Sequence, residues 1–404
     1  MTDSIKSPLG FELLVPFDHS SPDLGSGMIY YEFGQPYQKS KPTVIVISDA
    51  QQFYIRQGEV AKFQERWFGD AFNVLGIVGR GTSPQFIQVV LNEDESPNWI
   101  RAWNIFNYQQ WLGDIDAVRK SVLGDDGKVL IYGESGGAML AHQYLAEYGQ
   151  HVSRAFTRAV VNPYLVGQLG LNSDRFWKEV EEYDPGLLKD LDIVLERYRS
   201  TRSVVVMTLQ RQNFFVPPDQ IGAARAKLIK ALAAGDEDYF AKVRQEYEVD
   251  AVQEVMSSSE AIPIRVRLFE FLAPSGALER MGGSELFPDY EVQINISGPL
   301  IDLHRAKKIS LNDFPFRNLH KLDTEVFLLA GRWDHVVDYR STISLASRYP
   351  NHHLFLADDA HMFKKFEESG LLVPLIKSFF EFGLTDSKFQ KAFEKASPRR
   401  WQES

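Results

Sequence analysis

The sequence lacks cysteine altogether, and it contains neither a long apolar run nor a block of basic residues. Without cysteine, a disulfide framework, a thiolate-ligated metal site and a cysteine nucleophile are all excluded. No apolar run approaches the roughly 20 residues that a membrane-spanning helix needs. Acidic residues outnumber basic ones by 54 to 44, and the resulting net charge of −10 disfavours binding to nucleic acid or to an anionic membrane.

The remaining composition is that of a folded protein, with 44% hydrophobic and 24% charged residues in a chain of 404. Aromatic residues make up 13%, which is compatible with a well-filled core or with an apolar substrate pocket. Residues 1–8 are polar and lack the apolar stretch of a signal peptide, so we expect a cytoplasmic protein. We expect neither a metal nor an organic cofactor.

Apolar runs that are typical of buried strands alternate with amphipathic helical patterns at both ends of the chain. This rhythm predicts an α/β fold with a mostly parallel sheet and helices on both faces. The predicted strands are 28–33, 43–47, 72–78, 128–132, 156–161, 324–330 and 353–356. The predicted helices of the same region are 57–68, 107–123, 136–148, 339–348 and 364–381.

A long polar region with helical patterns separates the two parts of this α/β pattern. We therefore predict that residues 1–165 and 310–404 form the core, and that residues 166–309 form a mostly helical cap inserted into it. Within the cap, the run Ser203–Met207 is compatible with a strand or a helix. The tail after Asp386 is polar and charged, and we expect it to be loosely attached.

The segment Gly133-Glu134-Ser135-Gly136-Gly137 fits the pattern G-x-S-x-G directly between a predicted strand and a predicted helix. In this context a sharp turn raises the serine hydroxyl above the sheet, and small residues are needed where the chain turns tightly. We predict that Ser135 is a nucleophile. The N–H of Gly136, at the start of the helix, is expected to stabilise an oxyanion.

A serine nucleophile needs a base, and the base needs an orienting acid. Asp334 follows the strand 324–330 and His361 follows the strand 353–356, so both lie at the carboxyl edge where Ser135 lies. We predict that His361 is the general base and that Asp334 orients it. Two other acids, Asp338 and Asp358, are alternatives to Asp334. His304 is a further histidine, near enough to the predicted cap to line a pocket.

Taken together, the segment Gly133–Gly137, Gly331-x-x-Asp334 and Asp359-Ala360-His361 resemble the α/β-hydrolase superfamily. The resemblance covers roughly residues 28–165 and 310–382. The loop Gly79-Arg80-Gly81-Thr82-Ser83 is similar to one in the proline iminopeptidase-like branch, which carries a large helical cap. The resemblance implies an α/β-hydrolase fold.

Where the family carries His-Gly or His-Gly-Gly-Pro-Gly, this chain has Ser48-Asp49-Ala50. That loop supplies a second oxyanion donor in the family, so the resemblance assigns this part to the N–H of Ala50. The iminopeptidase branch also binds a substrate amine with acidic cap residues. Glu260 and Glu270 are the corresponding candidates, although we interpret both as solvated charges on helix surfaces.

These features predict a serine hydrolase that cleaves an ester, lactone or amide bond through an acyl-enzyme on Ser135. Its substrate is expected to be a small, partly apolar molecule or a short peptide. Two alternatives stay open: an acyltransferase or cofactor-free lyase on the same scaffold, and a binding protein with a degenerate site. Cap aromatics are expected to form an apolar lid, namely Phe214, Phe215, Phe269 and Phe271.

Overall fold

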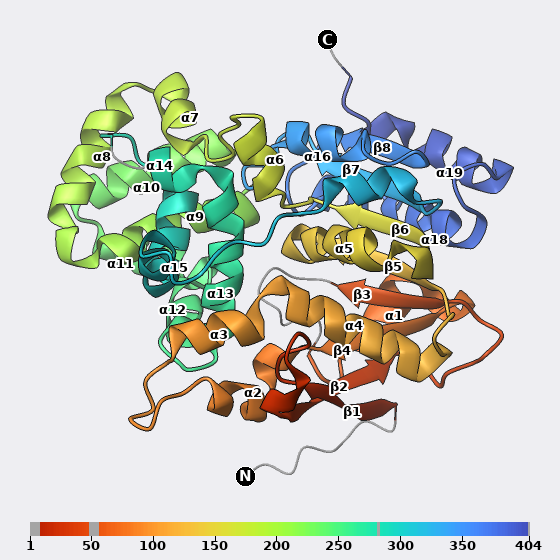
Figure 1. The fold of residues 1–404 in the computed structure, drawn as a ribbon. Helices are drawn as coiled ribbons and strands as arrows, with labels where there is room; N and C mark the ends of the chain where they lie inside the picture. Colours follow the sequence, from red (N-terminus) through yellow and green to blue (C-terminus); the bar gives the residue numbers. More distant parts are fainter. Residues whose placement is uncertain (1–8, 48–55, 281–282, 403–404) are drawn as a thin grey trace.

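The computed structural model describes residues 9–47, 56–280 and 283–402, and these residues build one eight-stranded sheet (Figure 1). Strand β2 runs antiparallel to its neighbours β1 and β4, and every other pair of neighbours is parallel. The strands lie in the order β1-β2-β4-β3-β5-β6-β7-β8. Their bounds are β1 (Gly10–Pro16), β2 (Ser26–Phe33), β3 (Thr43–Ile47), β4 (Asn73–Val78), β5 (Val129–Glu134), β6 (Val152–Arg158), β7 (Glu325–Gly331) and β8 (His352–Ala357).

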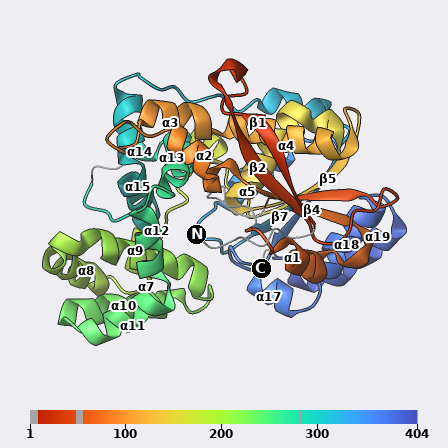
Figure 2. The same ribbon diagram turned by 90° about the horizontal axis from the view of Figure 1, so that it is seen from below.

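The central strands are buried on both faces, because helices cover each side of the sheet (Figures 1 and 2). In β3, Val44 and Val46 point to one hydrophobic cluster, and Ile45 and Ile47 point to the other, as the two-residue period of a strand requires. The first face is covered by α1 (Val60–Trp67), α18 (Leu372–Phe382) and α19 (Ser387–Ala396). The second face is covered by α4 (Tyr108–Leu123), α5 (Ser135–Tyr148) and α16 (Tyr339–Ala346).

The chain between β6 and β7 is helical in the part that the structure describes, and it forms the green and teal region of Figure 1. Part of this insertion has a hydrophobic core of its own, which includes Leu187, Val205 and Leu228. Val266 and Leu300, also in the insertion, instead belong to the hydrophobic cluster on the second face of the sheet. The helices are α6 (Pro163–Gln168), α7 (Phe176–Tyr183), α8 (Gly186–Arg197), α9 (Arg202–Phe215), α10 (Ile221–Ala234), α11 (Glu237–Glu246), α12 (Val249–Met256), α13 (Ala261–Leu272), α14 (Ala277–Arg280) and α15 (Pro288–Arg305).

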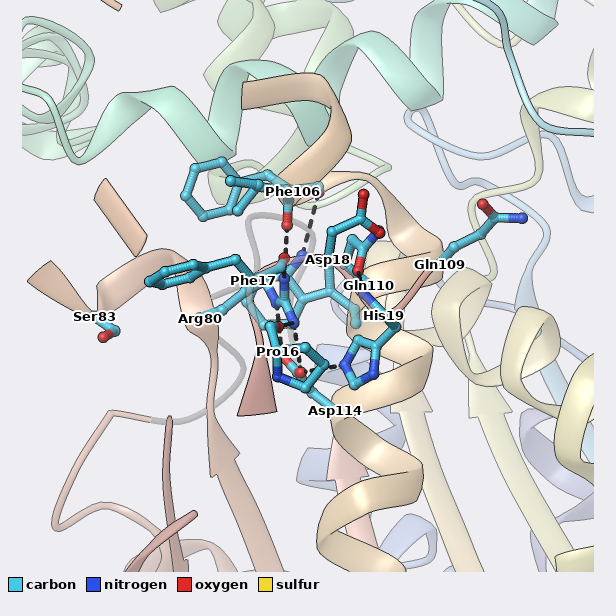
Figure 3. Close-up of polar contacts among 12 residues, drawn as sticks. Pro16, Phe17, Asp18, His19, Arg80, Ser83, Phe106, Gln109, Gln110 and Asp114 are labelled. Atoms are coloured by element: carbon cyan, nitrogen blue, oxygen red, sulfur yellow. Dashed lines mark hydrogen bonds and ion pairs between the residues drawn. The ribbon is translucent and has the colours of Figure 1, made fainter. Parts of the chain in front are cut away.

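Arg80, in the loop after β4, joins three segments of the core through its guanidinium group (Figure 3). It forms a bidentate ion pair with Asp114 of α4, at 2.7 and 2.6 Å, and its Nη1 donates to the carbonyls of Phe17 and Ile105. His19 is a second partner of Asp114, at 2.8 Å. The Arg80 side chain therefore holds the loop after β4 to the segment after β1, to α3 (Trp99–Phe106) and to α4.

The order of the strands, with β2 alone reversed, is that of the α/β-hydrolase fold. The predicted fold class is therefore confirmed. The sequence patterns did not predict β1 or the short helices of the β4–α4 connection, α2 (Pro84–Val89) and α3 (Trp99–Phe106).

Three predictions of local structure differ from the observed elements. Strand β6 ends at Arg158, because Ala159 has a φ of +48° and leaves the extended conformation. The run Ser203–Met207 lies in helix α9. The predicted closing helix is broken at Gly370, with a φ of +71°, into α18 and a shorter helix, α17 (Lys364–Glu368).

The prediction of a loosely attached tail is wrong. Phe389 of α19 is fully buried against the sheet, in the same cluster as Phe327 and Phe379. Further on, the N–H of Trp401 donates to the carbonyl of Leu356 at 2.8 Å. Although the tail is rich in charge, its apolar residues recur on one face of a helix, and that face completes the core.

Candidate active site

The turn between β5 and α5 presents Ser135 at the carboxyl edge of the sheet. Ser135 has a φ of +52°, a left-handed conformation that costs about 1–3 kcal/mol for residues other than glycine and that recurs at functional sites. A Cβ atom on Gly133 would lie 2.9 Å from the backbone of Ala138, so only glycine fits at that position. The carboxylate of Glu134 accepts hydrogen bonds from Arg158 and Tyr132.

The side chains of Ser135, His361 and Asp334 are joined by two hydrogen bonds in series. The Nε2 of His361 lies 3.0 Å from the Oγ of Ser135, and its Nδ1 lies 2.9 Å from the Oδ2 of Asp334. Because a carboxylate only accepts, the proton of a neutral His361 is on Nδ1, and Nε2 accepts from the serine hydroxyl. His361 and Asp334 are 5% and 3% exposed, so water competes little for this chain of hydrogen bonds.

Backbone N–H groups and one residue of the insertion fix the position of Asp334. Its Oδ1 accepts the N–H groups of Val336 and Val337, at 2.8 and 2.9 Å. The Nη2 of Arg175, in the insertion, donates to the carbonyl oxygen of Asp334 at 3.0 Å. The carboxylate is thus held on one oxygen by its own loop, and the other oxygen faces His361.

The rival residues are engaged elsewhere. Asp338 caps α16 and pairs with Arg340, and Asp358 accepts the indole N–H of Trp333 at 2.7 Å. His304 packs against Phe269, with ring centroids 5.7 Å apart, and it is not among the described residues that line the cavity at Ser135. The structure therefore brings Asp334 and His361 to Ser135, and none of the rivals.

Ser135 and His361 open into a cavity of about 1100 Å³ between the carboxyl edge of the sheet and the helices of the insertion. Of the four aromatic residues predicted to form a lid, Phe214 and Phe271 line this cavity, and the ring of Phe214 meets His361 edge-on at 5.4 Å. Phe269 is instead buried in the core, and Phe215 stacks near Tyr247. Two of the four residues therefore lie at the cavity, and the other two pack elsewhere.

Glu270 is not the solvated charge that its sequence context predicts. It is buried, pairs with Arg267 at 2.9 Å and accepts the N–H of Tyr108 at 2.7 Å. Burial raises the pKa of the Glu270 carboxyl, although Arg267 opposes this. Arg267 also donates to the carbonyl of Gly136, so the pair connects α13 to the turn that carries Ser135. Glu260, by contrast, is exposed and lines the cavity.

Sequence reasoning missed Asp289, a buried carboxylate that lines the cavity. Its two oxygens accept amide N–H groups from Gln210 and Gln293, at 2.9 and 2.8 Å. Burial raises the pKa of Asp289, and the hydrogen bond from Gln210 and the charge of His361 oppose this rise. No motif marks Asp289, because its surroundings come from α9 and from its own helix α15.

Of the two predicted oxyanion donors, only Gly136 lies among the residues that the structure describes. Gly136 lies in the first turn of α5, where backbone N–H groups have no partner within the helix. Ala50 and its neighbours Ser48 and Asp49 lie outside the described residues.

In the described part of the chain, no group of three potential metal-ligating side chains is found. Over the same residues, no helix has the length and apolar character that crossing a membrane requires.

Comparisons with known proteins found matches among solved structures, at low sequence identity. No family model matches the chain, and no curated protein matches it. Solved structures similar to it include a homoserine O-acetyltransferase from Staphylococcus aureus (13% identity, TM-score 0.48, covering 95% of this chain and 99% of that one). An esterase from Exiguobacterium antarcticum is 14% identical (TM-score 0.44, 87% and 97% covered), and a serine hydrolase from Cycloclasticus zankles is 12% identical (TM-score 0.46, 93% and 100% covered).

Proposed function

We propose that this protein is a serine hydrolase that cleaves esters through an acyl-enzyme on Ser135. The observation that supports the proposal is the chain of hydrogen bonds from Ser135 through His361 to Asp334 at the wall of a large cavity. A degenerate binding site would not need these three side chains at hydrogen-bond distance. The hydrolase also accounts for the left-handed conformation of Ser135, which a binding protein would have no reason to keep.

In the first half of the proposed reaction, the Oγ of Ser135 attacks the carbonyl carbon while the Nε2 of His361 takes the hydroxyl proton. The N–H of Gly136 stabilises the tetrahedral oxyanion, and Asp334 stabilises the imidazolium. The C–O bond to the leaving group then breaks, and His361 gives its proton to the departing alkoxide. In the second half, water attacks the acyl-enzyme, His361 takes and returns one proton, and the free acid leaves with Ser135 restored.

The peptidase version of the proposal has less support. Of the two acidic residues considered for binding an amine, Glu270 is already paired with Arg267 and does not line the cavity, and Glu260 lines it but is exposed to water. An ester needs no such partner. A screen of released products across p-nitrophenyl esters, lactones and aminoacyl amides separates these substrate types.

Labelling with a fluorophosphonate probe tests the nucleophile. We expect the wild type to be labelled and Ser135→Ala to be unlabelled, with a loss of about 10⁴-fold or more in kcat. Ser173→Ala is a matched control, because Ser173 lines the same cavity but bonds Tyr290 and not a histidine. An unlabelled wild type that hydrolyses no ester contradicts the proposal, and activity that needs an acceptor other than water favours an acyltransferase.

A further inference from the structure

The cavity beside Ser135 extends to both sides of β5 along the carboxyl edge of the sheet. Val78, the last residue of β4, and Thr82, in the loop after it, line one side, and Val336 and Met362, after β7 and β8, line the other. Strand β4 is two positions from β5 in the sheet, and neighbouring strands lie about 4.8 Å apart. The β4 side therefore reaches roughly 10 Å from the strand that carries the serine.

The side toward β7 and β8 carries several polar groups in addition to the apolar side chains of Val336 and Met362. His361 lies there, and so does Asp289, because Asp174 accepts the N–H of Asp289 and the adjacent Arg175 bonds the carbonyl of Asp334. The amide groups of Gln210 and Gln293 surround the Asp289 carboxylate. A substrate group on this side meets a base, a carboxylate and two amides.

The side toward β4 is lined mainly by apolar side chains, with Thr82 and Glu260 as polar residues of its lining, and it is covered by helices α12, α13 and α15. The start of α13 lies against the loop after β4, since a Cβ atom on Gly81 would come within 3.0 Å of Pro263. The guanidinium group of Arg265 donates to the carbonyls of Met256 and Ile296. These bonds join the end of α12, the start of α13 and the middle of α15 at this side.

We define the apolar arm of the cavity by five side chains, namely Val78, Met256, Ile264, Leu268 and Ile296. Ile264 and Leu268 are four residues apart on α13 and so share one face of the helix. Val78, Met256 and Leu268 are only half-buried, although each lines the cavity. Apolar surface left open in this way gains about 25 cal/mol per Å² when an apolar ligand covers it.

The direction of the reaction decides which part of a substrate the arm receives. In the proposed mechanism His361 protonates the leaving group, so the leaving group lies on the polar side of the cavity. The acyl group is attached to the opposite side of the carbonyl carbon and extends toward β4. We propose that the apolar arm binds the acyl chain, and that the substrate is an ester of an aliphatic acid whose chain is long enough to fill it; this inference rests on the proposed acyl transfer to Ser135.

A series of p-nitrophenyl esters from acetate to dodecanoate tests the arm in the wild-type protein. Each added methylene that becomes buried should raise kcat/KM about three- to fourfold, until the arm is full and the profile levels off. A flat or falling profile overturns the inference. So does a rise with the length of the alcohol in acetate esters that is absent with the length of the acid.

Two variants locate the effect in the arm, so that the failure of one to fold leaves the other. Met256→Trp places a larger side chain in the arm, and Leu268→Gln places a polar group in its wall. Each should lower the ratio of kcat/KM for octanoate to that for acetate by about tenfold or more. Ile193→Trp is the control, because Ile193 is 42% exposed on α8 and does not line the cavity; the profile should keep its wild-type slope. Variants that fold and retain the slope overturn the assignment.

Binding of dodecanoate to Ser135→Ala, measured by calorimetry, separates this inference from the proposed function. We expect binding that Met256→Trp weakens at least tenfold in Kd. If dodecanoate binds in this way but the wild type hydrolyses no ester, the proposed function fails and the apolar arm stands. If short esters are hydrolysed through Ser135 but dodecanoate does not bind, the apolar arm fails and the proposed function stands.

Discussion

The side chains of Arg80 and Arg267 are almost completely buried. Each forms an ion pair with one carboxylate, Arg80 with Asp114 and Arg267 with Glu270. Such a pair contributes little net stability relative to an apolar replacement, but a lone buried charge is costly. Arg80 has a further role because it bonds backbone carbonyls of two other segments. The pairs therefore act by fixing which segments lie together.

The Arg80–Asp114 pair gives a prediction for stability. Asp114→Ala should lower the free energy of unfolding by about 3–5 kcal/mol, because the guanidinium group is left buried without its partner. The double replacement Arg80→Met with Asp114→Leu should recover much of this loss. Urea denaturation measures both, with Glu196→Ala as a control, because Glu196 forms an exposed pair with Arg199. Equal stability of wild type and Asp114→Ala would contradict the prediction.

A second prediction at this scale concerns the hydrogen bond between Asp334 and His361. Asp334→Asn should keep the shape of the loop and lower kcat about 10⁴-fold, because an amide stabilises neither the required tautomer nor the imidazolium. Steady-state kinetics on a short ester measures this effect. Asp338→Asn, at the rival acid, should keep kcat within a few-fold, and the opposite ranking of the two variants would remove Asp334 from the proposed role.

At the scale of elements, the chain end supports the loops that carry Asp334 and His361. Residues 399–401, which we call the C-terminal strap, pair with the end of β8 through a bridge between Ala357 and Arg400. The guanidinium group of Arg332, next to the loop of Asp334, lies 4.8 Å from the ring of Trp401. It also lies 5.1 Å from the ring of Trp333 and 4.6 Å from that of Tyr339. The strap thus contacts the chain before both loops: Arg400 pairs with Ala357 before the loop of His361, and Trp401 contacts Arg332 before Asp334.

Removal of the strap contact should affect catalysis more than stability. Trp401→Ala is expected to lower kcat about 10–100-fold, because small displacements of reacting groups have effects of this size. The melting temperature should change by only a few degrees. Lys388→Ala is the control, since it removes a cation–π contact with Phe382 that touches neither loop. Equal kcat values for Trp401→Ala and the control would exclude this role of the strap.

At the scale of the whole molecule, the insertion contacts the loop that carries Asp334 through ionisable side chains. His335, next to Asp334, lies 3.1 Å from Glu179 of α7, which also pairs with Arg225. Burial alone would raise the pKa of Glu179, but the bonds from His335 and Arg225 outweigh burial and lower it to about 2. Glu179 is therefore ionised at neutral pH.

Asp174 predicts how stability depends on pH. Burial and the nearby Asp289 raise its pKa from 3.8 to about 7, and backbone N–H groups at the start of α15 oppose the rise. Between these values the native state binds more protons than the unfolded state, so stability should fall as pH rises from about 4 to about 7. Asp174→Asn should flatten this fall, by up to about 4 kcal/mol. Urea midpoints at pH 5 and pH 8 measure it, with exposed Asp192→Asn as control; parallel profiles for Asp174→Asn and the wild type contradict it.

The sequence alone determined the fold class and brought Ser135, His361 and Asp334 forward as candidates. Their signals are local: a strand, a tight glycine-flanked turn and a helix around Ser135, and a strand directly before each partner. Parallel strands end at one edge, so positions far apart in the chain were predicted to meet there. A single closing helix and a loose tail were predicted, and both predictions were wrong. For the tail the reason is that local polarity does not reveal which apolar residues find a partner.

Only the tertiary structure decided what surrounds these three residues. Glu270 is buried because Arg267 and the N–H of Tyr108, 162 residues away, meet it. Asp289 lies in the cavity because Asp174, 115 residues earlier, accepts its N–H. Such contacts depend on how the insertion folds over the sheet, and neither periodicity nor a motif encodes that placement. The arrangement of polar and apolar side chains around the cavity is therefore a property of the tertiary structure.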